Sequence, residues 1–363
     1  MTTYSGAKVA SPGSVELLHD RVLLMATDPT PAEIAEIDPR HGGLVAAGAQ
    51  AASTVKDLRA AFPSMPLLIE PQSASTYRAT ADQPFLVPDD GLWPLTLADC
   101  LDGQRQAGAS LVVTPSGQVD AGDGQTLKAL VNQANAVDAH DVATLVPIAD
   151  IWLTEPHIKQ LVAVLKGSAH PVLLGVVNSD GDPLQRKGAL EGYARLAGEV
   201  PGLILWRTDL SGLGALAHGA LAAVIGKRPS LRRYAKFDKP PFASNVSDNT
   251  PHVLLPGLMR YSRSRQMRTE WFATSPSLTC ACSCCHGRDL DRFDASGGAH
   301  TQAYLHNLTV LTEMVGACLS SSNRVQWWAS RMSDAMSAHV ELGNHINRQV
   351  PEPGYIRRWI DLS

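Results

Sequence analysis

A short cysteine cluster is the feature of this sequence best suited to chemistry. Four of the six cysteines lie between positions 280 and 285, which read Cys-Ala-Cys-Ser-Cys-Cys. Three of them, Cys280, Cys282 and Cys285, have C-x-C-x-x-C spacing, with which one tight loop can present three thiolates to a single tetrahedral zinc ion. Clustered cysteines in a chain without secretory features favour a metal site over a disulfide framework. We therefore expect Zn2+ as a bound cofactor.

Two arginine-rich segments could contact phosphate. They cover residues 227–236 and 260–268, where arginine alternates with small polar residues, a pattern that suits phosphate binding. Tyr234 and Tyr261 lie within them and could stack on a base. The alternative is that both segments are solvated surfaces. In the first segment the expected phosphate-binding side chains are Lys227, Arg228, Arg232 and Arg233.

The elements that would position these groups follow a repeating pattern. Short β-branched or leucine-rich runs alternate with alanine-rich stretches, which predicts strands at residues 22–25, 43–46, 66–69, 110–114, 144–148, 171–176, 202–206 and 221–225. Helices are expected at residues 53–62, 126–137, 155–165 and 184–197. Eight such units predict an α/β fold, a (β/α)8 TIM-type barrel. A doubly wound open sheet is the alternative, although no glycine-rich dinucleotide fingerprint follows the first strand.

The remainder of the chain predicts an appendage. Residues 236–250 are rich in Pro, Asp, Asn and Ser and are expected to form a loop. Residues 252–255 could be a further strand or part of the appendage, and helices are expected at about 302–319 and 324–342. We therefore divide the chain into a barrel, residues 1–250, and a C-terminal zinc-binding subdomain with closing helices, residues 251–363.

The region after the cysteine loop resembles the tRNA-guanine transglycosylase family. In that family a C-x-C-x-x-C loop precedes a helix that reads roughly S-R-A-Y-L-H-H-L, with E-I-L-G-A downstream. Here residues 301–308 read T-Q-A-Y-L-H-N-L and residues 313–317 read E-M-V-G-A. The resemblance implies a zinc-bearing subdomain on a (β/α)8 barrel, and it covers well only this loop and helix.

The zinc ligands depart from the family pattern in one respect. The family takes its fourth ligand from a histidine just after the helix, and alignment on the helix places Ser322 or Asn323 there. Neither side chain is a usual zinc ligand. Residues 287–299 are also an insertion. The fourth ligand therefore stays open, and a degenerate loop without metal is the alternative. Candidate replacements are His286, His300, His306, Cys284 and Cys318.

The resemblance also directs attention to two carboxylates. The family's nucleophile, in an F-D-C-V-x-P-T-R stretch of the last strand, aligns with Ala222, which cannot attack a ribose carbon. Its second carboxylate, in a proton-transfer role, aligns with Glu70. Asp209 follows the seventh predicted strand and could be a relocated nucleophile or base. We take Glu70 and Asp209 as the catalytic candidates. The alternatives are a solvated loop acid for Glu70 and a helix N-cap for Asp209.

Composition limits the function classes. The chain has 363 residues, 44% of them hydrophobic, and a formal net charge of −4, which argues against wholesale affinity for nucleic acid. No apolar run has the length of a membrane span, and the first residues show no secretory signal pattern. We expect a cytoplasmic protein without membrane partners.

Three functions follow from these residues. The first is a divergent transglycosylase-like enzyme that exchanges or handles a purine or 7-deazapurine base in tRNA or DNA. The second is a non-catalytic partner or nucleic-acid-binding subunit of such a system, favoured by Ala222. Because known family members pair near the zinc subdomain, we expect a homo- or heterodimer. The third is an unrelated barrel enzyme with a convergent cysteine loop.

Overall fold

The chain folds into two compact units, over the residues that the computed structural model describes: 16–88, 95–178, 181–238 and 248–362. The barrel unit comprises Met1–Asp28, Gly42–Gly226 and Ser230–Pro241. The C-terminal unit comprises Pro29–His41, Lys227–Pro229 and Phe242–Ser363. It therefore includes two short segments that the sequence analysis assigned to the barrel, and its main part begins at residue 242 rather than 251.

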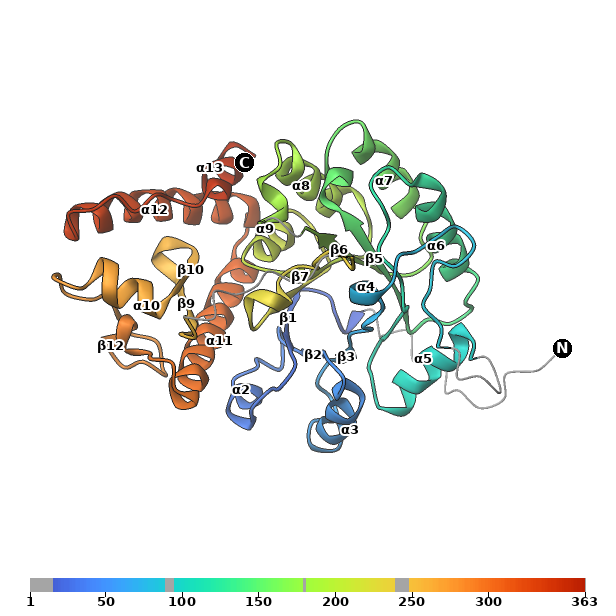
Figure 1. Ribbon diagram of the computed structural model, residues 1–363, viewed down its shortest axis with the longest axis horizontal. Helices are drawn as coiled ribbons and strands as arrows, with labels where there is room; N and C mark the ends of the chain where they lie inside the picture. The colour runs from blue at the N-terminus through green and yellow to red at the C-terminus, as the bar shows by residue number, and fades with distance from the viewer. Residues whose placement is uncertain (1–15, 89–94, 179–180, 239–247, 363) are drawn as a thin grey trace. The chain divides into compact units, whose positions relative to one another are not determined.

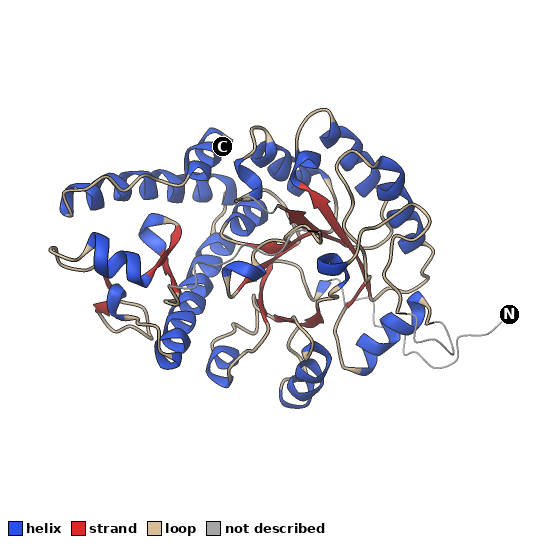
Figure 2. Ribbon diagram, in the orientation of Figure 1, coloured by secondary structure: helices blue, strands red, loops and turns tan. Residues whose placement is uncertain are grey.

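The barrel unit is built around an eight-stranded parallel sheet (Figure 1). Neighbouring strands follow the order β3-β2-β1-β8-β7-β6-β5-β4, so the sheet wraps almost completely around. Figure 2 shows the strands as an inner ring with helices outside them. The predicted TIM-type barrel and all eight predicted strands are confirmed. The strands are β1 (Arg21–Ala26), β2 (Leu44–Ala46), β3 (Leu67–Ile69), β4 (Val112–Val113), β5 (Val142–Ala149), β6 (Val172–Val177), β7 (Leu203–Thr208) and β8 (Ala222–Gly226).

The seam between β3 and β4 is closed by side chains and a single backbone bond. The backbone N–H of Ser110 donates to Leu67 O over 2.7 Å, and the hydroxyl of Ser110 accepts from Leu67 N over 3.1 Å. Arg59 donates to the same hydroxyl over 2.7 Å. Ser110 makes these contacts just before β4. The strand β4 itself is two residues long, shorter than the sequence predicts, and its ladder with β5 covers only these two residues.

Helices between the strands begin at the capping residues that the sequence offers. Thr96 and Asp99 form a reciprocal capping box, and the Asp123 carboxylate accepts from Thr126 N. The predicted helix at 184–197 begins later than expected because Gly188, at a φ of +85°, separates a short 3-10 turn from α8. The helices are α3 (Ala51–Ala61), α4 (Ser73–Thr76), α5 (Leu97–Gln106), α6 (Gly124–Asn135), α7 (His157–Leu165), α8 (Ala189–Glu199) and α9 (Ser211–Ala217).

The barrel interior is filled by alternate residues of the strands. Leu23 and Met25 of β1, and Ala222 and Val224 of β8, belong to one buried cluster. Two aromatic side chains, Trp206 and Tyr234, complete it. The period of two in these inward positions is the one expected for strands of a closed barrel.

The C-terminal unit combines small hairpins with long helices. A hairpin of β9 (His252–Leu255) and β10 (Arg260–Arg263) is followed by a shorter pair, β11 (Thr279–Cys280) and β12 (Arg288–Asp289). Both predicted C-terminal helices are confirmed. Of the predicted loop at 236–250, residues 239–247 lie outside the described residues. The helices of this unit are α2 (Pro31–Ala35), α10 (Ser264–Gln266), α11 (Gly297–Ser320), α12 (Arg324–His345) and α13 (Gly354–Asp361).

Aromatic packing joins the last two helices of the C-terminal unit. Trp328 of α12 and Trp359 of α13 are both fully buried and meet edge to face, with their ring centroids 5.8 Å apart. Within the described residues, no helix is both long enough and apolar enough to cross a membrane.

Candidate metal centre and the mouth of the barrel

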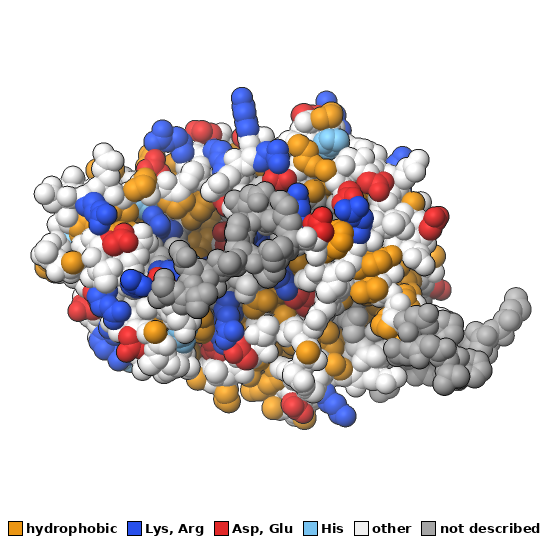
Figure 3. Space-filling model, viewed as in Figure 1, with side chains coloured by type: hydrophobic (Ala, Val, Ile, Leu, Met, Phe, Trp, Pro, Cys, Tyr) orange, Lys and Arg blue, Asp and Glu red, His pale blue; other side chains and the backbone are white. Residues whose placement is uncertain are grey.

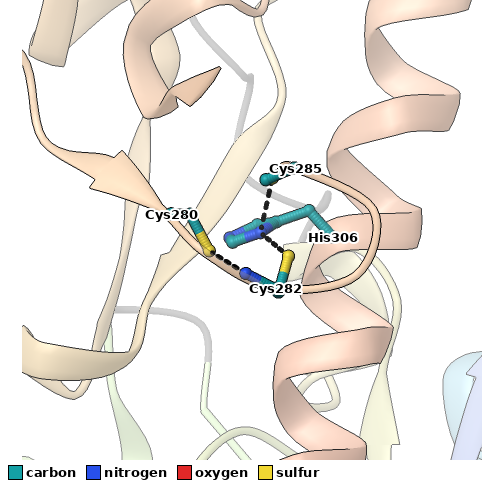
Figure 4. Close-up of side chains that lie close together, drawn as sticks. All are labelled: Cys280, Cys282, Cys285 and His306. Atoms are coloured by element: carbon teal, nitrogen blue, oxygen red, sulfur yellow. Dashed lines mark hydrogen bonds between the residues drawn. The ribbon is translucent and has the colours of Figure 1, made fainter. Parts of the chain in front are cut away.

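Three cysteines and one histidine converge in the C-terminal unit (Figure 4). Cys280 ends β11, Cys282 and Cys285 lie in the turn that follows, and His306 projects from α11. All four side chains are buried, and their ligand atoms lie within 4.8 Å of one another. The Nδ1 atom of His306 is 3.5 Å from Cys282 Sγ and 3.3 Å from Cys285 Sγ.

The local fold of the loop explains why the three thiols face one point. The backbone N–H groups of Cys285 and His286 both donate to Cys282 O, over 3.0 Å each, and Gly287 N donates to Cys280 O over 2.8 Å. His286 and Gly287 have φ values of +52° and +80°, which turn the chain sharply into β12. The loop thus folds back on itself and presents its sulfur atoms together.

The orientation of His306 is fixed from its far side. Its Nε2 lies 2.8 Å from Leu254 O, so Nε2 carries the proton and Nδ1 offers its lone pair to the cysteines. Burial lowers the pKa of His306, which keeps the imidazole neutral as metal binding requires. The ring also packs against Phe293, with centroids 6.4 Å apart.

The donor set fits a tetrahedral ion. Zinc bonds of about 2.3 Å to sulfur and about 2.0 Å to nitrogen place those ligand atoms about 3.5 Å apart. The two nitrogen–sulfur distances in the centre, 3.3 and 3.5 Å, match this spacing. Without a cation, burial raises the pKa of the Cys280 thiol to about 12. A bound cation would offset this cost of ionisation, so the group could hold a metal ion.

The centre bears out part of the sequence analysis and resolves what it left open. Cys280, Cys282 and Cys285 do come together. Of the five candidates for a fourth donor, His306 completes the group, and the other four lie outside it. The signal was in the helix pattern: His306 is three residues after Ala303 and four before Val310, both buried, so it lies on the apolar face of α11.

In the barrel unit, the candidate acid Glu70 is fully engaged by neighbouring side chains. It follows β3, and the residue as a whole is 3% exposed. Arg207 donates to both of its oxygens, through Nε to Oε1 and through Nη2 to Oε2, the latter over 2.8 Å. The hydroxyl of Tyr234 donates to Oε1 over 2.8 Å. Glu70 is therefore not a solvated loop acid, and both its oxygens are occupied by protein groups.

The backbone of β7 is distorted at Arg207, the residue that contacts Glu70. The φ angle of Arg207 is +53°, a left-handed conformation that costs a non-glycine residue of order 1–3 kcal/mol. The pairing of β7 with β8 also shifts register between Leu205 and Thr208. Beyond Glu70, Arg207 Nη1 donates to Ser230 O over 3.1 Å and to Arg233 O over 3.4 Å. Arg207 thus links the ends of β3 and β7 to the segment after β8.

Tyr234 enters the barrel instead of facing solvent. Its ring lies over Gly175 of β6, where an added Cβ would come within 2.5 Å of Tyr234 Cε2. Trp206 Nε1 donates to its hydroxyl over 3.1 Å, and the Arg207 guanidinium stacks 4.6 Å from its ring centroid. Burial raises the pKa of Tyr234, so the phenol stays neutral and donates to Glu70. Tyr234 is fully buried, which contradicts its predicted role in stacking on a base.

Asp209 lies after the end of β7, two residues before α9. Its Oδ1 accepts from Ser211 N, at the start of that helix, over 2.9 Å, but the N-cap position itself is Leu210, so Asp209 is not the N-cap that the alternative predicts. The side chain is half-buried and lines a small cavity of about 30 Å3 with Tyr193, Thr208 and Arg232. A role in proton transfer for Asp209 remains a prediction.

The predicted phosphate-binding residues turn inward. Lys227 is only 4% exposed in its side chain, and its ammonium lies 2.9 Å from Glu33 Oε1 and 2.9 Å from Oε2. Lys227 is thus already paired within the protein, and its contact with phosphate stays a prediction. Arg228 lies over the Tyr304 ring at 5.9 Å.

Arg232 and Arg233 donate to backbone oxygens. Arg232 Nε reaches Gly226 O over 2.9 Å, and Arg233 donates to Gly181 O. Both side chains are half-buried. On the face drawn in Figure 3, basic and acidic side chains are interspersed. The arginine-rich segment therefore stabilises the protein's own backbone, at least in part, rather than presenting all its charges to a ligand.

Ala222, at the matched position of the family's nucleophile, opens β8. It is fully buried and pairs with Arg21 of β1 and Ile204 of β7. Barrel active sites form at the carboxyl ends of strands, whereas Ala222 stands at the amino end of its strand.

The similarity of this chain to known proteins is weak. No protein-family model and no curated protein matches this chain. Among solved structures, 3-hexulose-6-phosphate synthase is similar over 56% of this chain and 89% of that chain, at 16% identity and a TM-score of 0.30. The carboxyl transferase domain of Rhizobium etli pyruvate carboxylase aligns with 95% of this chain and 62% of that chain, at 10% identity and 0.37. A monomeric dihydrodipicolinate synthase variant aligns with 95% of this chain and 96% of that chain, at 10% identity and 0.29.

Proposed function

We propose that this chain is a divergent tRNA-guanine transglycosylase-like protein that binds zinc and serves as a non-catalytic partner in base modification. The zinc assignment is supported by the donor set, because three cysteines and one histidine that are buried together are typical of structural zinc. All four positions are filled by protein side chains. The metal would therefore hold the C-terminal unit together and leave no open position for a substrate.

The state of Glu70 carries the non-catalytic part of the proposal. A general acid or base must come within hydrogen-bond reach of the proton that it transfers. Glu70 has both oxygens bonded to Arg207 and Tyr234 and is almost fully buried. Ala222, at the matched nucleophile position, carries no acid, but it lies at the amino end of β8, so Glu70 alone carries this part of the proposal. We infer that the barrel supports a binding role.

Base exchange with the purified protein tests the proposal. Zinc-loaded protein is incubated with tRNA or duplex DNA and labelled guanine or a labelled 7-deazaguanine, and incorporation into the nucleic acid is measured. We expect no incorporation, together with measurable binding of the nucleic acid by fluorescence anisotropy at low salt that weakens as salt rises. Incorporation that survives in Glu70→Gln and is lost in Asp209→Asn would contradict the non-catalytic role.

A catalytic role for Asp209 is the second candidate. Its carboxylate is half-buried at the carboxyl end of β7 and lines a small cavity, at the end of the strand where a barrel enzyme's acid or base is expected. In that case exchange would depend on Asp209, and Glu70 would act only by holding Arg207. The same assay separates the two candidates, since the Asp209→Asn variant retains an oxygen that can accept from Ser211 N and so preserves that hydrogen bond.

A further inference from the structure

The fourth cysteine of the loop lies beside the metal group without belonging to it. Cys284 Sγ is 3.4 Å from Cys282 Sγ and 3.9 Å from Cys285 Sγ. Its side chain is half-buried, whereas those of the three ligand cysteines are buried. A small reagent from solvent can therefore reach the Cys284 sulfur, which already contacts the sulfur of Cys282.

The distance to Cys282 is short enough for a disulfide to form. A disulfide bond is about 2.05 Å long, so the two sulfur atoms need to approach by about 1.4 Å. One residue, Ser283, separates the two cysteines, and the loop that carries them is exposed at Ser283. Movement of the Cys284 side chain alone can supply part of this approach.

Two arginines hold the loop that carries the cysteines. Arg292 Nη2 donates to Cys285 Sγ over 3.2 Å. Arg288 donates to two backbone oxygens of the loop, Cys284 O over 2.7 Å and Cys285 O over 2.9 Å. These contacts keep the backbone on both sides of Cys284 in place.

We propose that Cys282 and Cys284 form a reversible oxidation site that controls metal retention. The Cys284 sulfur attacks one oxygen of a hydroperoxide, the O–O bond breaks, and the departing oxygen takes up the thiol proton, which leaves a sulfenic acid on Cys284. The Cys282 sulfur then attacks the Cys284 sulfur, the S–O bond breaks, and the departing hydroxide takes up a proton and leaves as water. The two cysteines lose two electrons in total, and the peroxide gains them. The resulting disulfide removes one of the four metal donors.

This inference rests on the proposed zinc site, and its test begins by separating the two. Zinc content of the purified full-length chain is measured first by elemental analysis, with about one ion per chain expected. The protein is then treated with hydrogen peroxide while a chromophoric chelator records zinc release. Free thiols are alkylated and disulfides are mapped by mass spectrometry. We expect zinc release in step with a Cys282–Cys284 disulfide, and rebinding of zinc after a thiol reductant is added.

Two variants decide the outcome. Cys284→Ser should bind zinc and unfold thermally as the parent does, since Cys284 is not in the ligand group, but its zinc release under peroxide should slow several-fold. Cys100→Ser, a half-buried cysteine of the barrel unit, is the matched control and should behave as the parent. Release from Cys284→Ser at the parental rate, or maps without the Cys282–Cys284 bond, would overturn the proposal. A chain without zinc would refute the zinc assignment and with it the control of metal retention, whereas the disulfide map would still show separately whether Cys282 and Cys284 form a bond.

Discussion

The two units each bury a polar centre, and the two centres are completed in different ways. In the C-terminal unit, three thiols and an imidazole point at one another and could hold a cation between them. In the barrel unit, the carboxylate of Glu70 meets the guanidinium of Arg207 and the hydroxyl of Tyr234, so protein groups alone balance the charge. With the zinc that we propose, the first centre depends on a component from solution, and the second depends only on the fold. Conditions that remove metal should therefore distinguish the units.

The largest effect is expected from breaking the metal group. Cys282→Ser removes one of four donors, and structural zinc in small domains contributes about 10–16 kcal/mol of apparent binding free energy. We expect the C-terminal unit to lose its cooperative unfolding transition while the barrel transition changes little. Differential scanning calorimetry with and without a chelator measures this. A single transition that the variant and the chelator both leave unchanged would rule out a structural metal.

The next largest effect is expected from breaking the barrel centre. Glu70→Leu leaves the Arg207 guanidinium without its partner, and an unpaired buried charge costs about 3–5 kcal/mol. The double variant Glu70→Leu/Arg207→Met removes both charges and should regain most of that lost stability. It should relieve the backbone strain at position 207 only in part. Denaturant unfolding of the parent, both single variants and the double variant gives the coupling free energy. Additive effects would show that the pair contributes nothing as a pair.

A smaller effect tests how Tyr234 fits the barrel. Gly175→Ala places a methyl group 2.5 Å from the Tyr234 ring, and such overpacking typically costs about 1–3 kcal/mol. The control is Gly103→Ala in α5, where an added Cβ meets nothing within 4 Å and helix propensity should stabilise by about 0.5–1 kcal/mol. Opposite signs in the two variants' free energies of unfolding are the expected result. Equal effects would show that Tyr234 does not occupy the space beside Gly175.

The smallest effect concerns pH and separates the units once more. His339 of α12 is buried between the carbonyl oxygens of Leu258 and Val350, at 3.1 and 3.2 Å. Burial lowers its pKa and nearby Arg260 lowers it further, while the hydrogen bonds to Leu258 O and Val350 O and the charge of Glu352 oppose the shift. Since the unfolded chain then binds this proton more readily, stability falls as pH falls from the unfolded pKa of about 6.5 toward the folded pKa.

The His339→Gln variant is the test of that titration. Glutamine can donate to one of the same carbonyl groups but does not titrate. The pH dependence of the C-terminal unit's melting temperature should be weaker in this variant than in the parent, while that of the barrel unit stays unchanged. Identical pH profiles would assign the dependence to other groups.

The sequence predicts the two centres unequally, for physical reasons. The barrel strands can be predicted from the sequence because both faces of the sheet are buried, the inner face by the barrel core and the outer face by helices. Such burial produces short apolar runs at regular intervals. The metal cysteines are readable because their spacing along the chain is itself the geometric requirement. By contrast, Arg207 and Glu70 are 137 residues apart, and Tyr234 and Glu70 are 164 apart. Only the closed sheet brings them together, so no local pattern reports the pairing.

His306 falls between these cases. The sequence offered five donors for the fourth position, and the choice depends on which helix face packs against the cysteine loop. The buried positions along α11 include His306 but exclude His300, whose Nε2 lies 2.7 Å from Asn249 O. Alignment to the family's usual position could not find it, because there the donor lies beyond the helix.

The insertion of Tyr234 beside Gly175 also defines the smallest edit that would open this barrel. Truncating the side chain to glycine would leave a void shaped like p-cresol, with the Glu70 carboxylate as an acceptor and Trp206 Nε1 as a donor at the place of the missing hydroxyl. A ligand of that size and polarity could then be supplied from solution. Removing the Tyr234 side chain should therefore turn the barrel into a receptor for small phenols.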